Sequence, residues 1–142
     1  MKGLCRTLML TAALWPAWTY AQTAPDMMAK AVKADDMKWE PLGDGADISI
    51  LYTNPTTQAT YLVIRAPANA HVPRHWHTSN ESITVLKGTF VVAHDGSKEK
   101  TELAPGSFAY MPAKMIHEAW TKGEGATYFI TVDGKWDVNF VK

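Results

Sequence analysis

The chain has 142 residues, of which 46% are hydrophobic, and its 14 lysine and arginine residues balance 14 acidic residues. A chain of this length is expected to form one domain with a substantial hydrophobic core. The balanced charge, with no basic stripe interleaved with aromatic residues, argues against nucleic acid as a partner.

The first 21 residues have the pattern of an export signal. Lys2 and Arg6 give a positive start, an apolar run follows over residues 8–15, and Ala21 ends a small-x-small cleavage site. The run is shorter than the roughly 20 residues that cross a bilayer, and an uncleaved N-terminal anchor is the alternative. We expect a periplasmic or secreted protein with no membrane contact after the signal peptide, residues 1–21, is removed.

Cleavage after Ala21 is directly testable. The mature protein should begin at Gln22 and should lack Cys5, the only cysteine of the chain. Mass spectrometry of exported protein measures this start. An intact Met1, or protein found wholly in the cytoplasm, would contradict the prediction.

Residues 22–38 are expected to form a short amphipathic helix or a loose arm, because Met27, Met28, Ala31 and Val32 recur at helical spacing. The segment 39–142 is predicted to be the folded domain. It consists of short β-type runs separated by turn residues, with hairpin turns expected at Lys87-Gly88 and Asp95-Gly96. The expected strands are 47–52, 60–65, 81–86, 89–94, 98–103, 107–111, 116–121, 126–132 and 136–141. This pattern predicts an all-β fold, a small antiparallel jelly roll or barrel with a pocket.

The chemistry of the chain is concentrated between residues 69 and 88. On an extended strand, His75 and His77 point to one face, and Glu81 keeps the same parity. A later strand-like segment offers His117 as a fourth ligand. Neutral imidazoles with one carboxylate suit a divalent transition metal, namely Fe, Mn, Ni, Cu or Zn.

These residues resemble the two motifs of the cupin superfamily. The first motif is Gly-x5-His-x-His-x3–4-Glu-x6-Gly. The second motif is Gly-x5-Pro-x-Gly-x2-His-x3-Asn. The matching positions are His75, His77, Glu81 and Gly88 in the first motif, and Gly106, Pro112 and His117 in the second. The resemblance covers about residues 39–132. It implies a double-stranded β-helix of the jelly-roll kind that holds one metal through His75, His77, Glu81 and His117.

Three positions depart from the cupin pattern. Asn69 and Lys114 stand where the motifs have glycine, and Thr121 replaces the closing asparagine. If those glycines adopt a left-handed backbone, asparagine tolerates this conformation well, whereas it costs about 1–2 kcal/mol for lysine.

The predicted pocket follows from the parity of the ligands. Ile83, Val85 and Ala119 share that parity and are expected to line the pocket, with ordinary core packing as the alternative, above all for Val85. His71 and His94 match no ligand position and are expected on the surface or at the rim.

The expected function is a metal-dependent dioxygenase-type oxidoreductase acting on a small organic compound, with Glu81 doubling as the catalytic base. The absence of a second acid or base on a ligand-parity position favours oxygen chemistry. The alternatives are a non-redox lyase, decarboxylase or isomerase, and a non-catalytic metal or small-ligand binding protein, because cupins host all three classes. The resemblance also implies a homodimer. Trp39, Trp76, Trp120 and Trp136 are expected to add aromatic surface to its interface.

Overall fold

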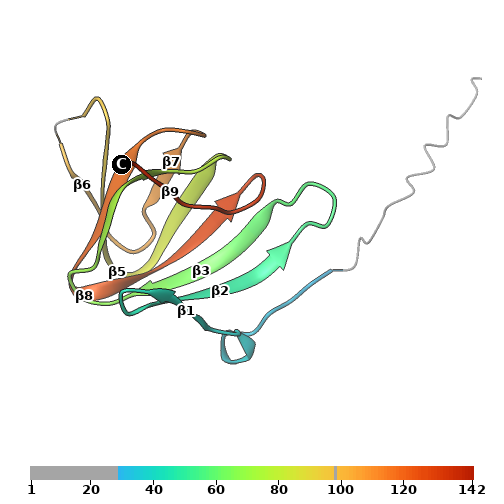
Figure 1. The fold of residues 1–142 in the computed structure, drawn as a ribbon. Coiled ribbons are helices and arrows are strands. Elements are labelled where there is room, and N and C mark those ends of the chain that lie inside the picture. Colours follow the sequence, from blue (N-terminus) through green and yellow to red (C-terminus); the bar gives the residue numbers. More distant parts are fainter. Residues whose placement is uncertain (1–28, 98) are drawn as a thin grey trace, which may run out of the picture.

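The structure is a computed structural model that describes residues 29–97 and 99–142. The expected signal peptide and the first residues of the arm lie outside this range. The described elements are one 3₁₀ turn and a series of strands (Figure 1): η1 (Ala34–Asp36), β1 (Glu40–Gly43), β2 (Ala46–Thr53), β3 (Thr60–Ala66), β4 (His71–Trp76), β5 (Glu81–His94), β6 (Thr101–Leu103), β7 (Phe108–Met111), β8 (His117–Val132) and β9 (Asn139–Phe140). The all-β prediction is confirmed. Nowhere in residues 29–97 and 99–142 is a helix long and apolar enough to cross a membrane.

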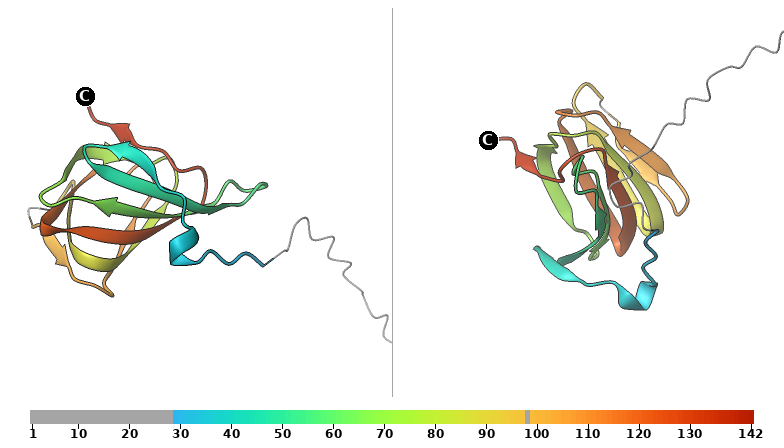
Figure 2. Two further views of the ribbon diagram at one scale, coloured as in Figure 1. Left: turned by 90° about the horizontal axis from the view of Figure 1, so that it is seen from below. Right: turned by 90° about the vertical axis from the view of Figure 1, so that its right-hand side faces the viewer.

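All strand pairs are antiparallel, and the sheet is organised around the two longest strands, β5 and β8. Strand β8 pairs with β3 through residues 126–132 and with β4 through residues 117–120. Strand β5 runs beside β8 over nearly its whole length and also pairs with β6 and β7. Because each long strand belongs to both halves of the sheet, the sheet curls around its own interior, as the views in Figure 2 show.

The expected hairpin turn at Lys87-Gly88 is wrong, and so is the break expected between the strands 116–121 and 126–132. Both segments lie inside continuous strands, and Gly88 and Gly125 have positive φ angles of 74° and 72°. The two backbones approach each other so closely that a Cβ atom on Gly88 would lie 2.0 Å from the carbonyl oxygen of Gly125. These glycines therefore mark the place where two paired strands bend together.

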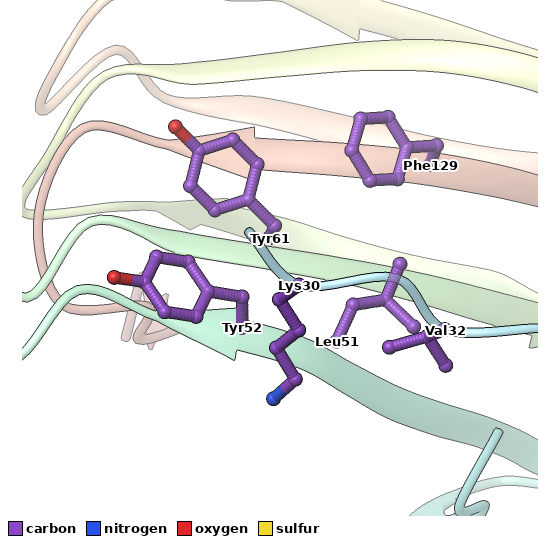
Figure 3. Close-up of a pocket in the computed structure, with 6 residues that line it drawn as sticks. All are labelled: Lys30, Val32, Leu51, Tyr52, Tyr61 and Phe129. Carbon is purple, nitrogen blue, oxygen red and sulfur yellow. The ribbon is translucent and has the colours of Figure 1, made fainter. Parts of the chain in front are cut away.

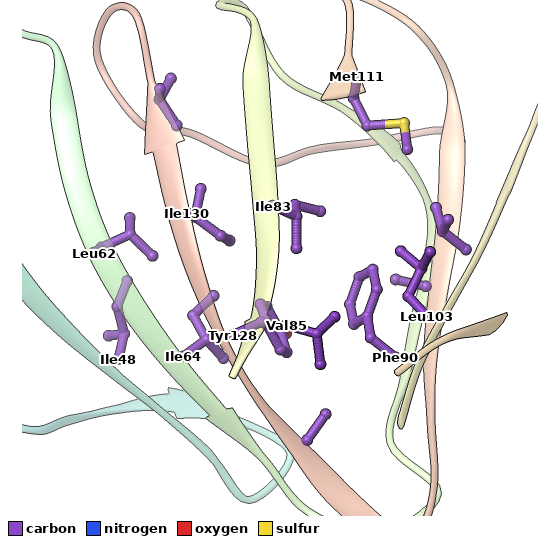
Figure 4. Close-up of a cluster of buried hydrophobic side chains, with 14 residues drawn as sticks. Ile48, Leu62, Ile64, Ile83, Val85, Phe90, Leu103, Met111, Tyr128 and Ile130 are labelled. Carbon is purple, nitrogen blue, oxygen red and sulfur yellow. The ribbon is translucent and has the colours of Figure 1, made fainter. Parts of the chain in front are cut away.

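The core fills the inside of the curled sheet. Alternate residues of the strands point inward, and Figure 4 shows Leu62 and Ile64 of β3 beside Ile130 of β8 and Ile83 of β5. Val85 belongs to this core and is 1% exposed. The buried apolar side chains hold β3, β8 and β5 in fixed positions, which in turn fixes the residues at the ends of these strands.

Two of the residues that depart from the cupin pattern, Asn69 and Lys114, adopt the left-handed backbone conformation expected for the glycines that they replace. Asn69 has φ 56° and Lys114 has φ 64°, both in the left-handed region. Thr121, the third departure, is buried. Its hydroxyl donates to the carbonyl oxygen of Pro67 (2.5 Å) and accepts from the amide of Ala70 (3.0 Å), so it ties β8 to the turn before β4.

Replacing Lys114 by glycine should raise the free energy of unfolding by about 1 kcal/mol, because glycine adopts a positive φ without steric penalty. The Lys114 side chain is exposed, and its amide, which donates to the carbonyl oxygen of His77 (2.8 Å), is kept in the variant. Urea unfolding measures the change. Lys135→Gly is the matched control: Lys135 is exposed and outside the positive-φ region, so its replacement should lower stability.

The aromatic surface differs from the one expected for a dimer interface. The four tryptophans of the domain are half-buried, with Arg65 over the ring of Trp39 and Lys100 over that of Trp120, each 3.6 Å from the ring centroid. The exposed large apolar side chains in the described range are Leu42, Ile50, Tyr61, Leu86, Phe108, Tyr110 and Phe140. The homodimer stays a prediction.

Candidate metal centre

Three histidines, from β4, from the residue after it and from β8, meet inside the curled sheet. His75 lies near the end of β4, His77 directly follows this strand, and His117 begins β8, where it is the register partner of His75. Their exposures are only 3–4%. One ring nitrogen of each lies within 4.8 Å of the corresponding nitrogens of the other two.

The backbone fixes the tautomer of all three rings. The Nδ1–H group of His75 donates to the carbonyl oxygen of Pro73 (2.7 Å), that of His117 to Met115 (3.0 Å), and that of His77 to Asp137. In a neutral imidazole with its proton on Nδ1, Nε2 carries a free lone pair. The Nε2 atoms of His75 and His117 therefore offer lone pairs, and Nε2 of His77 does so when its ring is neutral. Within the described part of the chain, Nε2 of His77 is buried without a hydrogen-bond partner.

Glu81, the first residue of β5, completes the group of predicted ligands. It is 3% exposed, and its Oε2 atom lies 3.3 Å from Nε2 of His77 and 3.7 Å from Nε2 of His117. The structure thus brings all four predicted residues to one point. The mutually close ligand atoms belong to the three histidines, with Glu81 beside two of them.

The electrostatic environment keeps two of these rings neutral. Burial, assisted by the neighbouring His117, lowers the pKa of His75 to about 4. Burial also lowers the pKa of His117. Burial opposes protonation of His77 as well, but the Glu81 carboxylate outweighs it, so the pKa of His77 is raised. Neutral His75 and His117 are in the state that metal ligation requires.

The C-terminal segment holds the His77 region in place, which the sequence analysis missed. The carboxylate of Asp137 accepts hydrogen bonds from the amide (2.9 Å) and the hydroxyl (2.6 Å) of Thr78, and Asp133 accepts two from Asn80. The strand expected at 136–141 is reduced to β9, and the remainder is an irregular segment. No local motif marks this segment, because its partners lie more than fifty residues earlier in the chain.

The four site residues line a cavity of about 70 Å³. Ile83 and Ala119 line it, whereas Val85 lies in the core and does not. Tyr128 and Trp136 also line it and were not expected there. Within the described range, the lining holds no further lysine, arginine, histidine or carboxylate.

The other two histidines lie outside this cavity. His71 is half-exposed, and its Nε2 is 3.1 Å from Oε2 of Glu118. His94 is exposed at the rim, where β5 places it opposite His117 in register.

The described part of the chain also forms two hollows that are larger than this cavity. One, of about 330 Å³, shares five lining residues with the cavity and adjoins it. The other, of about 450 Å³, lies where the arm crosses β2, β3 and β8, and is lined by Lys30, Val32, Leu51, Tyr52, Tyr61 and Phe129 (Figure 3). The described residues that line this second hollow include no histidine or carboxylate, so they offer no comparable chemistry.

A curled all-β barrel with three converging histidines and an adjacent carboxylate defines a metal-binding cupin. The chain belongs to the family of the ChrR cupin-like domain, which matches residues 27–134. It is 31% identical over 94 residues to a DNA damage-repair/toleration protein of Arabidopsis thaliana, covering 66% of this chain and 29% of that protein. The chain therefore spans less than a third of the length of this relative.

Two solved structures share the fold at low sequence identity. An acetylacetone dioxygenase from Acinetobacter johnsonii has a TM-score of 0.67 and 16% identity, covering 84% of this chain and 82% of that chain. An oxalate decarboxylase variant from Bacillus subtilis has a TM-score of 0.65 and 17% identity, covering 80% of this chain and 32% of that chain. At these identities the likeness shows the common fold alone.

Proposed function

We propose that this cupin is a metal-dependent dioxygenase-type oxidoreductase acting on a small organic compound. The observation that carries the proposal is the convergence of three histidine Nε2 atoms whose tautomers are set by backbone carbonyl groups. We assign His75, His77, Glu81 and His117 as the ligands of one divalent transition metal.

The donor set fits such an ion. Three imidazoles and one carboxylate are ligands that Fe, Mn, Ni, Cu and Zn share, and a bound ion would satisfy the unpartnered Nε2 of His77. The hydrogen bonds to the Nδ1 atoms are the outer contacts that metal-ligating histidines need for a fixed orientation. When bound, the ion supplies Lewis-acid polarisation of a substrate oxygen and, if redox-active, electrons for dioxygen chemistry.

The residues of the chain accept the substrate proton, exclude water and orient the imidazoles. Glu81 is the one carboxylate in the cavity lining of the described chain, so its Oε2 atom is the acceptor for a proton taken from the substrate. Ile83, Ala119 and the other apolar walls keep water away from this carboxylate. The backbone carbonyl groups of Pro73, Asp137 and Met115 prevent the imidazoles from turning while the proton moves.

Tyr128 favours a second candidate function, a non-redox lyase, decarboxylase or isomerase. This residue lines the cavity, and burial together with the charge of Glu81 raises the pKa of its hydroxyl, which stays protonated. A phenol hydroxyl and a carboxylate in one cavity supply a proton donor and a proton acceptor, which proton transfer between carbon atoms requires.

A comparison of metals with and without air separates these functions. Metal-free protein is loaded with Fe(II), Mn(II), Cu(II) or Zn(II), and small enolisable, phenolic and carboxylate compounds are assayed by oxygen uptake and product analysis. The proposal expects turnover only with a redox-active metal and only in air. Equal turnover with Zn(II) under nitrogen would reject it in favour of the lyase, and binding without turnover under every condition would leave a binding protein.

A further inference from the structure

The 330 Å³ hollow beside the metal cavity, here called the outer chamber, is shaped to hold an organic molecule. It lies between the β1–β2 turn, the start of β4 and the C-terminal segment, and its volume is within the roughly 300–1,000 Å³ typical of ligand pockets. The metal cavity alone holds about 70 Å³, which is too small for more than the reacting end of a substrate. The outer chamber is therefore the place available for the rest of the molecule.

The chemistry of the outer chamber selects an apolar body. Its walls are mostly aliphatic and aromatic, with Ala46, Ala66 and Val138 among them. Besides Tyr128, the titratable side chains in its lining are Asp44, which is exposed in the β1–β2 turn, and His71, whose Nε2 lies beside the Glu118 carboxylate. Among the described residues, the lining holds no buried lysine or arginine that would compensate a charge on the ligand's body.

The boundary between chamber and cavity carries two neutral hydrogen-bond donors. Leu42, Val72, Tyr128, Trp136 and Val138 line both hollows. Of these side chains, Trp136 has a buried Nε1–H group that finds no partner in the described part of the chain. An unpaired buried donor is unfavourable and is commonly satisfied by a ligand or by water. The second donor is the protonated hydroxyl of Tyr128.

We propose that the outer chamber binds the apolar body of a small compound bearing a carboxylate, enolate or phenolate oxygen, which accepts a hydrogen bond from Trp136. The oxygen lies at the boundary of the two hollows, where it faces the histidines, and the apolar body extends past Val72 and Val138. This assignment rests on the proposed metal site and adds the class of substrate to it.

Calorimetry on the zinc-loaded full chain tests the assignment without any turnover. The probes are benzoate and hexanoate, with acetate as the probe without an apolar body and succinate as the probe with a second charge. We expect benzoate or hexanoate to bind at least tenfold more tightly than acetate and succinate. Equal affinities for all four, or binding of none, would overturn the proposal.

Two variants locate the binding. Trp136→Phe keeps the aromatic ring but removes the donor, so it should weaken binding about tenfold or more with unchanged zinc content. Trp39→Phe is the matched control, because Trp39 lines neither hollow and should leave affinity unchanged. Unaltered affinity in Trp136→Phe would contradict the role of this tryptophan.

Ala46→Leu provides a test that does not depend on the hydrogen bond. A larger side chain at this half-buried position fills part of the outer chamber, so hexanoate should bind more weakly while acetate is unaffected. Equal loss for both probes would contradict the location of the apolar body. Since zinc is redox-inert, failure of oxygen uptake leaves this inference standing. Equal affinity for benzoate, hexanoate, acetate and succinate rejects it without touching the oxygenase proposal.

Discussion

Replacing His77 by alanine should remove stoichiometric metal from the purified protein while the β-fold remains. The imidazole of His77 supplies one of the three converging nitrogen atoms. The residue lies just after β4 and is not part of the hydrophobic core, so the fold does not depend on it. We expect metal affinity to fall by more than roughly a hundredfold, because loss of a ligand should exceed the 10–100-fold effect of losing an outer contact. Metal analysis after dialysis measures the loss, and far-ultraviolet circular dichroism checks the fold.

His94→Ala is the matched control for this prediction. His94 lies opposite His117 in register but is exposed at the rim and does not line the cavity. Its replacement should leave the metal content unchanged. A His77→Ala protein that still holds one metal per chain would contradict the assigned ligand set.

Replacing Gly88 by alanine should destabilise the protein by about 4 kcal/mol, which is at the upper end of single-residue effects. The added Cβ atom would lie 2.0 Å from the carbonyl oxygen of Gly125, and neither backbone can move without breaking the β5–β8 ladder. The positive φ of 74° adds its own penalty for a residue with a side chain. Urea or thermal unfolding measures the change, and failure to obtain soluble protein agrees with it.

Gly96→Ala separates the steric contact from the backbone penalty. Gly96 also has a positive φ, 90°, but a Cβ atom there would meet no atom of the described residues within 4 Å. Its replacement should therefore cost only about 1–2 kcal/mol. Equal losses in the two variants would show that the approach of Gly88 to Gly125 does not control stability.

The metal site was accessible from sequence because its signal is local. His75, His77 and Glu81 lie within seven residues. Strand alternation places His75 and His77 on one side, and the short connection to β5 returns Glu81 to them. The left-handed backbone of Asn69 and Lys114 was also predictable, since both replace glycines of the motifs. The element boundaries around Gly88 were not predictable, because a glycine marks a turn and a bend equally well. Only the pairing of β5 with β8 decides between them.

The residues behind the ligands could not be found in this way. Asp137 holds the Nδ1–H group of His77 through its backbone carbonyl, which carries no information about residue type. Trp136 was expected at a dimer interface, but the course of the C-terminal segment brings it to the cavity. The contact between Asp137 and His77 joins segments sixty residues apart, and Trp136 meets the cavity through the same C-terminal segment. No periodicity or spacing within this segment therefore predicts either position.

Anomalous diffraction from crystals of the metal-loaded protein tests the central claim most directly. Data collected at the absorption edge of the added metal should show one peak per chain, roughly 2.0–2.2 Å from Nε2 of His75, His77 and His117, with Glu81 completing the set. No peak at this point, or a single peak elsewhere, such as beside His71 and Glu118, would contradict the account.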